Sequence, residues 1–186
     1  MIISLSGTPG TGKSDVAKNL AMELDANLIS IGGLVKSKRV QYKFDKKRKT
    51  RIIDIGDLQK AVKKKLVKDE INIVEGHLSH LIEADRVIIL RMNPIKLRKR
   101  LLNRDWSKAK VEENVQAEIL DEIILEALQK HRKSKIFEID VTGLKTRNII
   151  HILTQLCKPK ILNKYLKIYR VGKVDWSENY KNELIK

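Results

Sequence analysis

A glycine-rich turn near the N-terminus carries a lysine and a hydroxyl side chain at fixed spacing. Residues 7–14 read Gly-Thr-Pro-Gly-Thr-Gly-Lys-Ser, which matches the pattern G-x-x-x-x-G-K-[ST] at every fixed position. The glycines let the backbone curl so that successive N–H groups point at phosphate oxygens, and the helix that comes next turns its positive end to the same place. We therefore expect a nucleoside triphosphate to be held by Thr8, Gly10, Thr11, Gly12 and Lys13, with Ser14 on Mg²⁺.

Short apolar runs alternate along the chain with segments of helical periodicity. Strands are expected at residues 1–6, 28–31, 71–75, 86–91 and 136–140. Helices are expected over residues 13–24, 58–67, 94–103, 111–129 and 145–156. This alternation predicts an α/β fold of the P-loop NTPase type, in which helices cover both faces of a five-stranded parallel sheet in three α/β/α layers.

Two segments fit this alternation less well. Gly32 and Gly33 are expected to close the second strand, and residues 34–51 to be helical at first and then a loop. After Cys157 the pattern loosens, so that residues 158–186 form a strand pair, a helix against the core, or a segment ordered only by a partner.

The chain is strongly basic, with 39 Lys and Arg against 23 Asp and Glu and a formal net charge of +16. This excess favours a polyanionic partner such as nucleic acid or a ribonucleoprotein. The alternative is a heat-adapted surface rich in ion pairs, which would require more acids. Half of the net charge falls in residues 36–51, where nine Lys or Arg accompany one acid, Asp45. We expect this stretch to meet RNA or an acidic surface, or to be a solvated run of charge.

The cysteine count and the distribution of apolar residues exclude disulfide-linked, zinc-cysteine and membrane-spanning proteins. A single cysteine, Cys157, excludes an internal disulfide and a zinc site built on cysteines. The chain shows no signal-peptide pattern and no apolar run of the roughly 18 residues needed to cross a bilayer. We expect a soluble, cytoplasmic protein without a membrane partner.

The residues after the phosphate loop narrow the type of nucleotide enzyme. A guanine-specific GTPase carries Asn-Lys-x-Asp on a later strand, whereas residues 163–166 read Asn-Lys-Tyr-Leu and lie outside the expected core. One small sheet with two insertions is instead typical, by analogy, of a nucleoside monophosphate kinase.

Several further motifs occur in a characteristic order. They are Ile-Gly-Gly-Leu at 31–34, Ile-Val-Glu-Gly-His at 73–77, Leu-Arg at 90–91, Arg-Leu-x-x-Arg at 100–104 and Glu-Asn-Val-Gln-Ala-Glu-Ile at 113–119. With the phosphate loop they make residues 1 to about 156 resemble adenylate kinase isoenzyme 6, the coilin-interacting nuclear ATPase family with its archaeal relatives.

This resemblance implies a dual activity. One part is adenylate kinase chemistry, in which ATP and AMP give two ADP; the other is an ATPase role in maturation of the small ribosomal subunit. The implied partners are a ribosomal protein of the subunit platform and rRNA. The implied organisation is a kinase-like domain at 1–157, with an acceptor-binding insertion at about 33–57 and a lid at about 103–112, followed by an extension at 158–186.

The resemblance also assigns residues. Glu75 stands where the family has a Walker B aspartate, so it is expected near Mg²⁺, although its longer side chain leaves direct contact open. His77 matches a histidine linked to ATP hydrolysis. Arg100 and Arg104, which are four apart and therefore expected on one helix face, match arginines that flank the lid. Gly32 and Lys36 are expected at the acceptor nucleotide, with Lys36 in place of an arginine. The expected catalytic group is Lys13, Glu75, His77 and Arg104.

Plainer interpretations stay open at each position. Glu75 would then be a water-exposed strand end, His77 a structural hydrogen-bonding group, and the arginines solvated. For the whole chain, a metabolic nucleoside monophosphate kinase competes with an ATP-driven assembly factor and with a kinase of another small molecule, of the shikimate or cytidylate type. We favour the first two combined.

Overall fold

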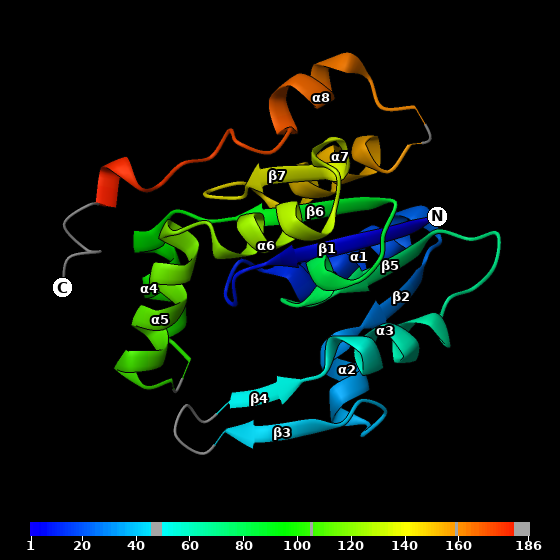
Figure 1. Ribbon diagram of the computed structural model, residues 1–186. Coiled ribbons are helices and arrows are strands. Elements are labelled where there is room, and N and C mark those ends of the chain that lie inside the picture. Colours follow the sequence, from blue (N-terminus) through cyan, green and yellow to red (C-terminus); the bar gives the residue numbers. More distant parts are fainter. Residues whose placement is uncertain (46–49, 105, 159, 181–186) are drawn as a thin grey trace.

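Five parallel strands form the centre of the computed structural model, which describes residues 1–45, 50–104, 106–158 and 160–180. The strand order across the sheet is β2 (Asn27–Ser30), β5 (Asn72–Glu75), β1 (Ile2–Gly7), β6 (Arg86–Arg91) and β7 (Ile136–Asp140) (Figure 1). The five predicted strands are therefore confirmed to within two residues.

Helices cover both faces of this sheet. Four helices pack with one face, in the largest apolar cluster: α1 (Lys13–Leu24), α4 (Pro94–Leu102), α5 (Lys108–Ile119) and α7 (Thr146–Leu156). The opposite face is covered by α2 (Ile31–Lys36), α3 (Ile55–Lys63) and α6 (Glu122–Lys130). Ile88 belongs to the first cluster and Ile89 to the face under α6, so the all-apolar centre of strand β6 is buried on both sides. The predicted three-layer α/β/α fold is confirmed.

The predicted single helix over residues 111–129 is wrong. The structure has α5 and α6, separated at Leu120 and Asp121, and Asp121 adopts a left-handed conformation with φ of 57°. The Asp121 carboxylate accepts a hydrogen bond from Arg91 on β6. We attribute the break to this tertiary contact, which the helical spacing does not reveal.

The segment after β2 also differs from expectation. Gly32 and Gly33 lie in the first turn of α2, because the Ser30 hydroxyl caps that helix by accepting from the Gly33 N–H at 3.3 Å. The expected loop contains an antiparallel hairpin of β3 (Tyr42–Asp45) and β4 (Thr50–Ile53). The lysine and arginine run at residues 46–49 lies outside the described residues.

The C-terminal segment returns to the sheet as a helix, one of the three expected possibilities. Helix α8 (Asn163–Tyr169) contacts α7 and β7, and Tyr165 and Tyr169 pack against the large apolar cluster. Arg170 then pairs with Phe137 at the edge of β7. Three single turns complete the elements: η1 (Ser79–Leu81), η2 (Lys133–Lys135) and η3 (Glu178–Tyr180). In the described part of the chain, no helix combines the length and apolar character needed to cross a membrane.

Candidate nucleotide-binding site

The glycine-rich loop joins the carboxyl end of the central strand β1 to the start of α1. Gly7, Gly10 and Gly12 have φ of 141°, 101° and 94°, a region that side chains with a Cβ rarely adopt. A Cβ on Gly10 would lie 2.9 Å from Leu97 Cδ1, so the close packing of the loop on α4 also requires glycine. The loop is further fixed by the Thr11 hydroxyl, which donates to the Thr8 carbonyl at 2.9 Å. The loop thus forms a backbone cradle at the N-terminus of α1, where free N–H groups can bind phosphate.

Lys13 is almost fully buried in this cradle. Its ammonium donates to the Thr8 carbonyl at 3.2 Å, so the side chain folds back over the loop. The pKa of Lys13 is lowered to about 8, mainly by burial; the carboxylate of Glu75 opposes the shift, the charge of Arg104 adds to it, and Glu118 opposes it. A buried cation with such a depressed pKa gains from a phosphate partner, because the phosphate restores its charged form.

Glu75 ends β5 opposite the start of α1. It is only 7% exposed, and it accepts hydrogen bonds from the Ser30 hydroxyl at 2.8 Å and the Ser14 hydroxyl at 3.3 Å. The structure thus brings Ser14 and Glu75 together, and it does not leave Glu75 as a water-exposed strand end. Hydroxyl and carboxylate oxygens are the ligands that Mg²⁺ prefers, so this pair fits that ion. Within the described residues no three His, Cys, Asp or Glu side chains gather as a metal site, so phosphate and water oxygens would complete the coordination.

His77 lies two residues after Glu75. Solvent reaches its ring, yet the surrounding protein lowers the pKa of His77 to about 4, first through partial desolvation and then through the charge of Lys13. The His77 carbonyl accepts a hydrogen bond from the Ser6 hydroxyl at 3.0 Å, which ties this loop to β1. His77 therefore carries a neutral imidazole beside the phosphate loop at neutral pH.

His80, three residues further on, plays a structural part. Its ring is 1% exposed, with Nδ1 3.0 Å from the Ser6 hydroxyl and Nε2 2.7 Å from a carboxylate oxygen of Glu126 on α6. His80 was not among the expected site residues, although its spacing from His77 is visible in the sequence. It joins β1, the 76–82 loop and α6, and so sets the position of the loop that carries His77.

The two predicted arginines lie on the α4 side of the cradle. Arg100 Nη1 donates to the Gly10 carbonyl at 3.4 Å. Arg104 lies beyond the end of α4 at Leu102, so the expectation that both arginines share one helix face is wrong. The Asn103 cap ends the helix, and the Arg104 guanidinium lies 5.9 Å from the centre of the Trp106 ring. Both side chains are solvent-exposed.

The expected acceptor-side residues lie on α2. Gly32 and Gly33 are exposed in its first turn, directly after Ser30, and a Cβ at Gly32 would meet nothing closer than 3.7 Å. Lys36 is exposed in the last turn of the same helix. The Ser30 hydroxyl thus links the start of α2 to Glu75 and, through it, to Ser14.

A buried charged cluster behind the loop was missed by sequence reasoning. The Thr8 hydroxyl donates to Glu118 on α5, whose other oxygen accepts from Arg91 Nε at 2.7 Å and from Trp176 Nε1 at 3.3 Å. Arg91 also pairs with Glu138 on β7, at 3.3 Å. The signal in the sequence was the presence of Arg91 and Glu138 in two mostly apolar strands, because buried charges require partners.

The amino-acid sequence is similar to those of several known proteins. The profile of the family described as "AAA domain" matches residues 3–121. A protein named "Putative adenylate kinase" from Thermococcus onnurineus is 37% identical over 97% of this chain and 93% of its own length. A protein of the same name from Archaeoglobus fulgidus is also 37% identical, over 95% of this chain and 92% of its own length. A protein of the same name from Methanocaldococcus jannaschii is 36% identical over 97% of this chain and 95% of its own. The chain belongs to the family of these archaeal proteins. Their alignments span 97% of the chain in two cases, so the similarity extends beyond residue 156 into the C-terminal segment.

Solved structures show the same fold at lower identity. A shikimate kinase from Bacteroides thetaiotaomicron superposes with a TM-score of 0.52 at 16% identity, covering 84% of this chain and 97% of its own. A thymidylate kinase from Candida albicans gives 0.54 at 14% identity, covering 89% and 92%. These neighbours carry the α/β P-loop fold.

Proposed function

We propose that this protein is an adenylate kinase that transfers the γ-phosphoryl group of ATP to AMP in the presence of Mg²⁺. The observation that carries the proposal is the phosphate loop itself, in which Lys13 is buried and Ser14 faces Glu75 at 3.3 Å. Family membership with proteins named for adenylate kinase supports the choice of reaction. Phosphoryl transfer requires alignment of donor and acceptor and stabilisation of charge, and little covalent chemistry from the protein.

Each residue has a defined task in this proposal. The loop backbone from Thr8 to Gly12 and the Lys13 ammonium hold the triphosphate, and Ser14 with Glu75 holds the magnesium, which supplies further positive charge at the phosphates. Arg100 and Arg104 neutralise charge on the transferring group from the α4 side. AMP is bound on the side of α2, near Gly32 and Lys36. Because Lys36 lacks the planar fork of arginine, we expect weaker acceptor binding than an arginine would give.

The same proposal divides the chain into functional parts. Residues from about 33 to 57, which include most of α2 and the β3–β4 hairpin, form the acceptor-binding insertion, and residues from about 103 to 112 form the lid. Closure of the lid would exclude water and favour transfer to AMP over hydrolysis.

A second activity, ATP hydrolysis, is favoured by one observation at the site. His77 is neutral, solvent-accessible and two residues from Glu75, which suits a group that positions a water molecule. The resemblance to the coilin-interacting nuclear ATPase family extends this to a role in small ribosomal subunit maturation, with a platform ribosomal protein and rRNA as partners. The net charge of +16 supports a polyanionic partner.

The deciding experiment incubates the purified protein with Mg·ATP, with and without AMP, and measures ADP and free phosphate separately. An adenylate kinase forms two ADP for each ATP consumed, without phosphate release, and Lys13→Ala abolishes this while the exposed Lys18→Ala does not. Phosphate release that is indifferent to AMP and rises with the ribosomal protein or RNA would leave an assembly ATPase and refute the acceptor-site assignments.

A further inference from the structure

Two separate segments of the sequence contain several Lys and Arg residues but no Asp or Glu. Residues 158–174 contain Lys or Arg at six positions, and residues 127–137 contain them at four, and neither stretch contains Asp or Glu. We define the basic band by eight of these residues: Lys130, Arg132, Lys133, Lys135, Lys160, Lys164, Lys167 and Arg170. No part of this band belongs to the phosphate loop or to the acceptor side.

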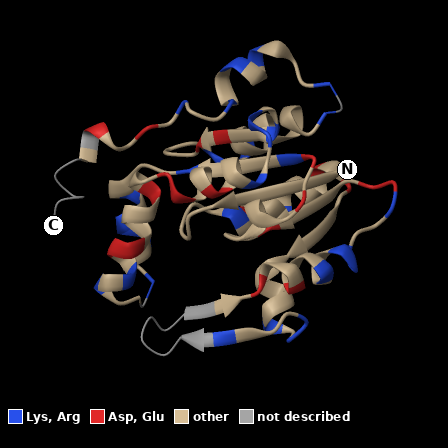
Figure 2. Cartoon of the chain, in the orientation of Figure 1, with Lys and Arg blue, Asp and Glu red and all other residues tan. Residues whose placement is uncertain are grey.

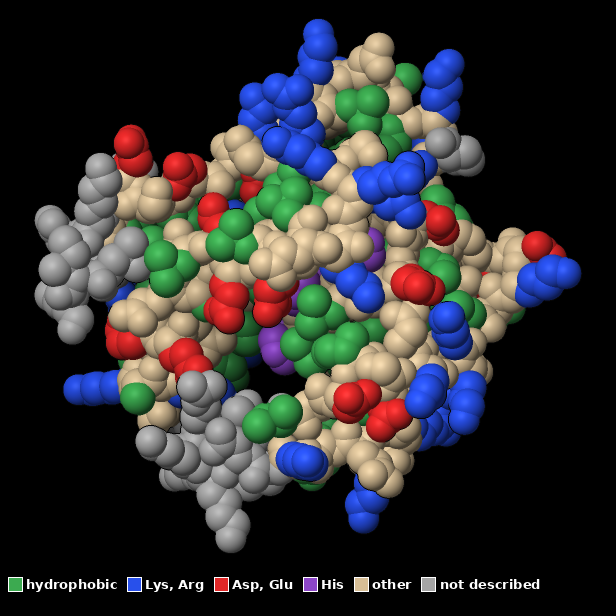
Figure 3. Space-filling model, in the orientation of Figure 1, with side chains coloured by type: hydrophobic (Ala, Val, Ile, Leu, Met, Phe, Trp, Pro, Cys, Tyr) green, Lys and Arg blue, Asp and Glu red, His purple; other side chains and the backbone are tan. Residues whose placement is uncertain are grey.

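The fold joins the two segments. Arg170, the residue after α8, pairs with Phe137 near the start of β7, and β7 itself comes directly after the single turn Lys133–Lys135. Since β7 is the edge strand, the two basic segments meet along one edge of the sheet. Figure 2 marks the Lys and Arg positions of α8 in blue at the top of the molecule, and Figure 3 shows blue side chains gathered in the same region.

Helix α8 is held so that its cations face solvent. Tyr165 and Tyr169 lie on its inner side, stacked with centroids 6.0 Å apart and packed against the large apolar cluster. Lys164, Lys167 and Arg170 are exposed. Among the described residues, none of the carboxylates forms an ion pair with a side chain of the band. The charges of Lys164, Lys167 and Arg170 are thus accessible to a ligand.

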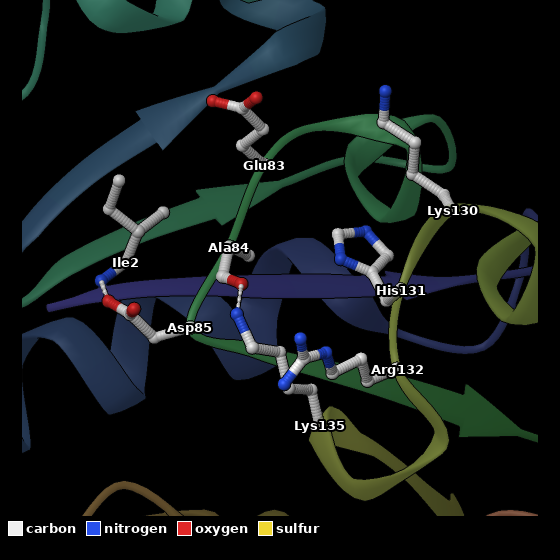
Figure 4. A pocket seen from close by; sticks show the side chains of 8 residues that line it. All are labelled: Ile2, Glu83, Ala84, Asp85, Lys130, His131, Arg132 and Lys135. Carbon is white, nitrogen blue, oxygen red and sulfur yellow. Dashed lines mark hydrogen bonds between the residues drawn. The ribbon is translucent and has the colours of Figure 1, made fainter.

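The second segment borders a hollow of about 600 Å³ at the amino ends of the strands, away from the phosphate loop (Figure 4). Lys130, Arg132 and Lys135 line it. Two acids share the lining, but Glu83 is paired with Lys63 at 3.5 Å and Asp85 accepts from the Ile2 N–H at 2.8 Å. Lys135 donates to the Ala84 carbonyl at 3.2 Å, whereas Lys130 and Arg132 are exposed.

Exposed apolar side chains stand among the cations of α8. Leu162, Leu166 and Ile168 are 52%, 37% and 57% exposed. A ligand that matches this surface therefore offers both negative charge and apolar area. Single-stranded nucleic acid offers both, in its phosphates and in its unstacked bases.

We propose that the basic band is a binding surface for single-stranded nucleic acid, independent of the nucleotide kinase site. Six of its eight cations are lysines. Lysine is depleted in interfaces between proteins and is a common partner of phosphate, so the composition favours a phosphate backbone over an acidic protein face. The cations hold phosphates, and Leu162, Leu166 and Ile168 provide the apolar surface for bases.

The test measures binding of the full-length protein to a fluorescent uridine oligonucleotide by anisotropy, between about 50 and 200 mM salt. The variants are Lys164→Glu with Lys167→Glu, and Lys130→Glu with Arg132→Glu. The matched control is Lys64→Glu with Lys65→Glu, which makes the same change in charge at exposed lysines outside the band. Each band variant should bind at least about tenfold more weakly and lower the salt slope by about 1.4, for two lost single-strand phosphate contacts.

The control should retain the affinity to within about twofold, since its lysines touch no ligand. ADP formation from ATP and AMP should be unchanged in all three variants, which also shows that they are folded. The proposal is overturned if the control loses as much affinity as the band variants, or if the band variants bind like the unaltered protein. It is equally overturned if the band binds an acidic polypeptide but not the oligonucleotide.

Discussion

The hydroxyl of Thr8 donates a hydrogen bond to the carboxylate of Glu118, a residue 110 positions later in the chain. Glu118 is 2% exposed, and its other oxygen accepts from Arg91 Nε at 2.7 Å and from the Met92 N–H at 3.1 Å. The shape of the phosphate loop therefore depends on α5 and β6 as well as on its own glycines. A buried carboxylate with this many donors holds its neighbours firmly, because any loss leaves charge unpaired in the interior.

Replacing Glu118 by Gln should destabilise the protein strongly. The substitution keeps the shape of the side chain but removes the main counter-charge of the buried Arg91, which should cost about 3 kcal/mol in the free energy of unfolding. Urea denaturation measures this directly. Glu112→Gln is the matched control, since it weakens the partly exposed Arg98–Glu112 pair at 2.8 Å and should cost less than about 1 kcal/mol. Equal losses of unfolding free energy in the two variants would show that the buried cluster stabilises the protein no more than a partly exposed ion pair does.

How far the sequence predicts this site depends on the range of the interactions. The phosphate loop could be predicted because its chemistry lies in eight consecutive residues between an apolar strand and a helix. Glu118 could not, because its role arises only when α5 packs beside β6. For the same reason the helical spacing of residues 111–129 did not predict the break at Asp121, whose carboxylate accepts a hydrogen bond from Arg91.

The hairpin at residues 42–53 shows a different limit. Its strands are short, and a run of four cations at residues 46–49 stands between them in the sequence, so composition favoured a loop. Tyr42 and Ile53 nevertheless face each other across an antiparallel pair. Strand pairing of this kind depends on the partner strand more than on the propensity of either segment.

Ser30 should act as a positioning residue for Glu75. Its hydroxyl donates to Glu75 at 2.8 Å and caps α2 by accepting from Gly33, so two roles must be separated. Ser30→Ala removes both, and Ser30→Asp keeps a capping oxygen but places a second carboxylate beside Glu75. Both variants should lower kcat about tenfold and raise the Mg²⁺ concentration needed for half-maximal rate, by analogy with the loss of an outer-shell partner. Recovery of the rate in Ser30→Asp would mean that only the helix cap matters.

The affinity for ATP should depend on pH through Lys13. The pKa of Lys13 is lowered to about 8 by burial, and phosphate binding requires its charged form. Below pH 8 the free protein already carries this charge, so affinity should be level. Above pH 8 a proton must be taken up on binding, and the affinity should fall by up to about tenfold per pH unit. Calorimetry at several pH values measures this fall. In Lys13→Arg the side chain stays charged at every pH tested, so the decrease in ATP affinity above pH 8 should disappear. The altered geometry can lower the affinity of this variant, but by the same factor at each pH.

His77 should distinguish hydrolysis from transfer. Because its pKa is lowered to about 4, the neutral imidazole can orient water throughout the neutral range. His77→Gln should reduce phosphate release without AMP by at least about tenfold, as expected for a group that positions water or a proton. ADP formation with AMP should change by less than about threefold, since the acceptor replaces water. His80→Gln is the comparison: its buried ring is tied to Glu126 at 2.7 Å, so both rates should fall together with stability. A parallel loss of both activities in a stably folded His77→Gln would assign His77 to transfer itself, and its separate role in hydrolysis would be refuted.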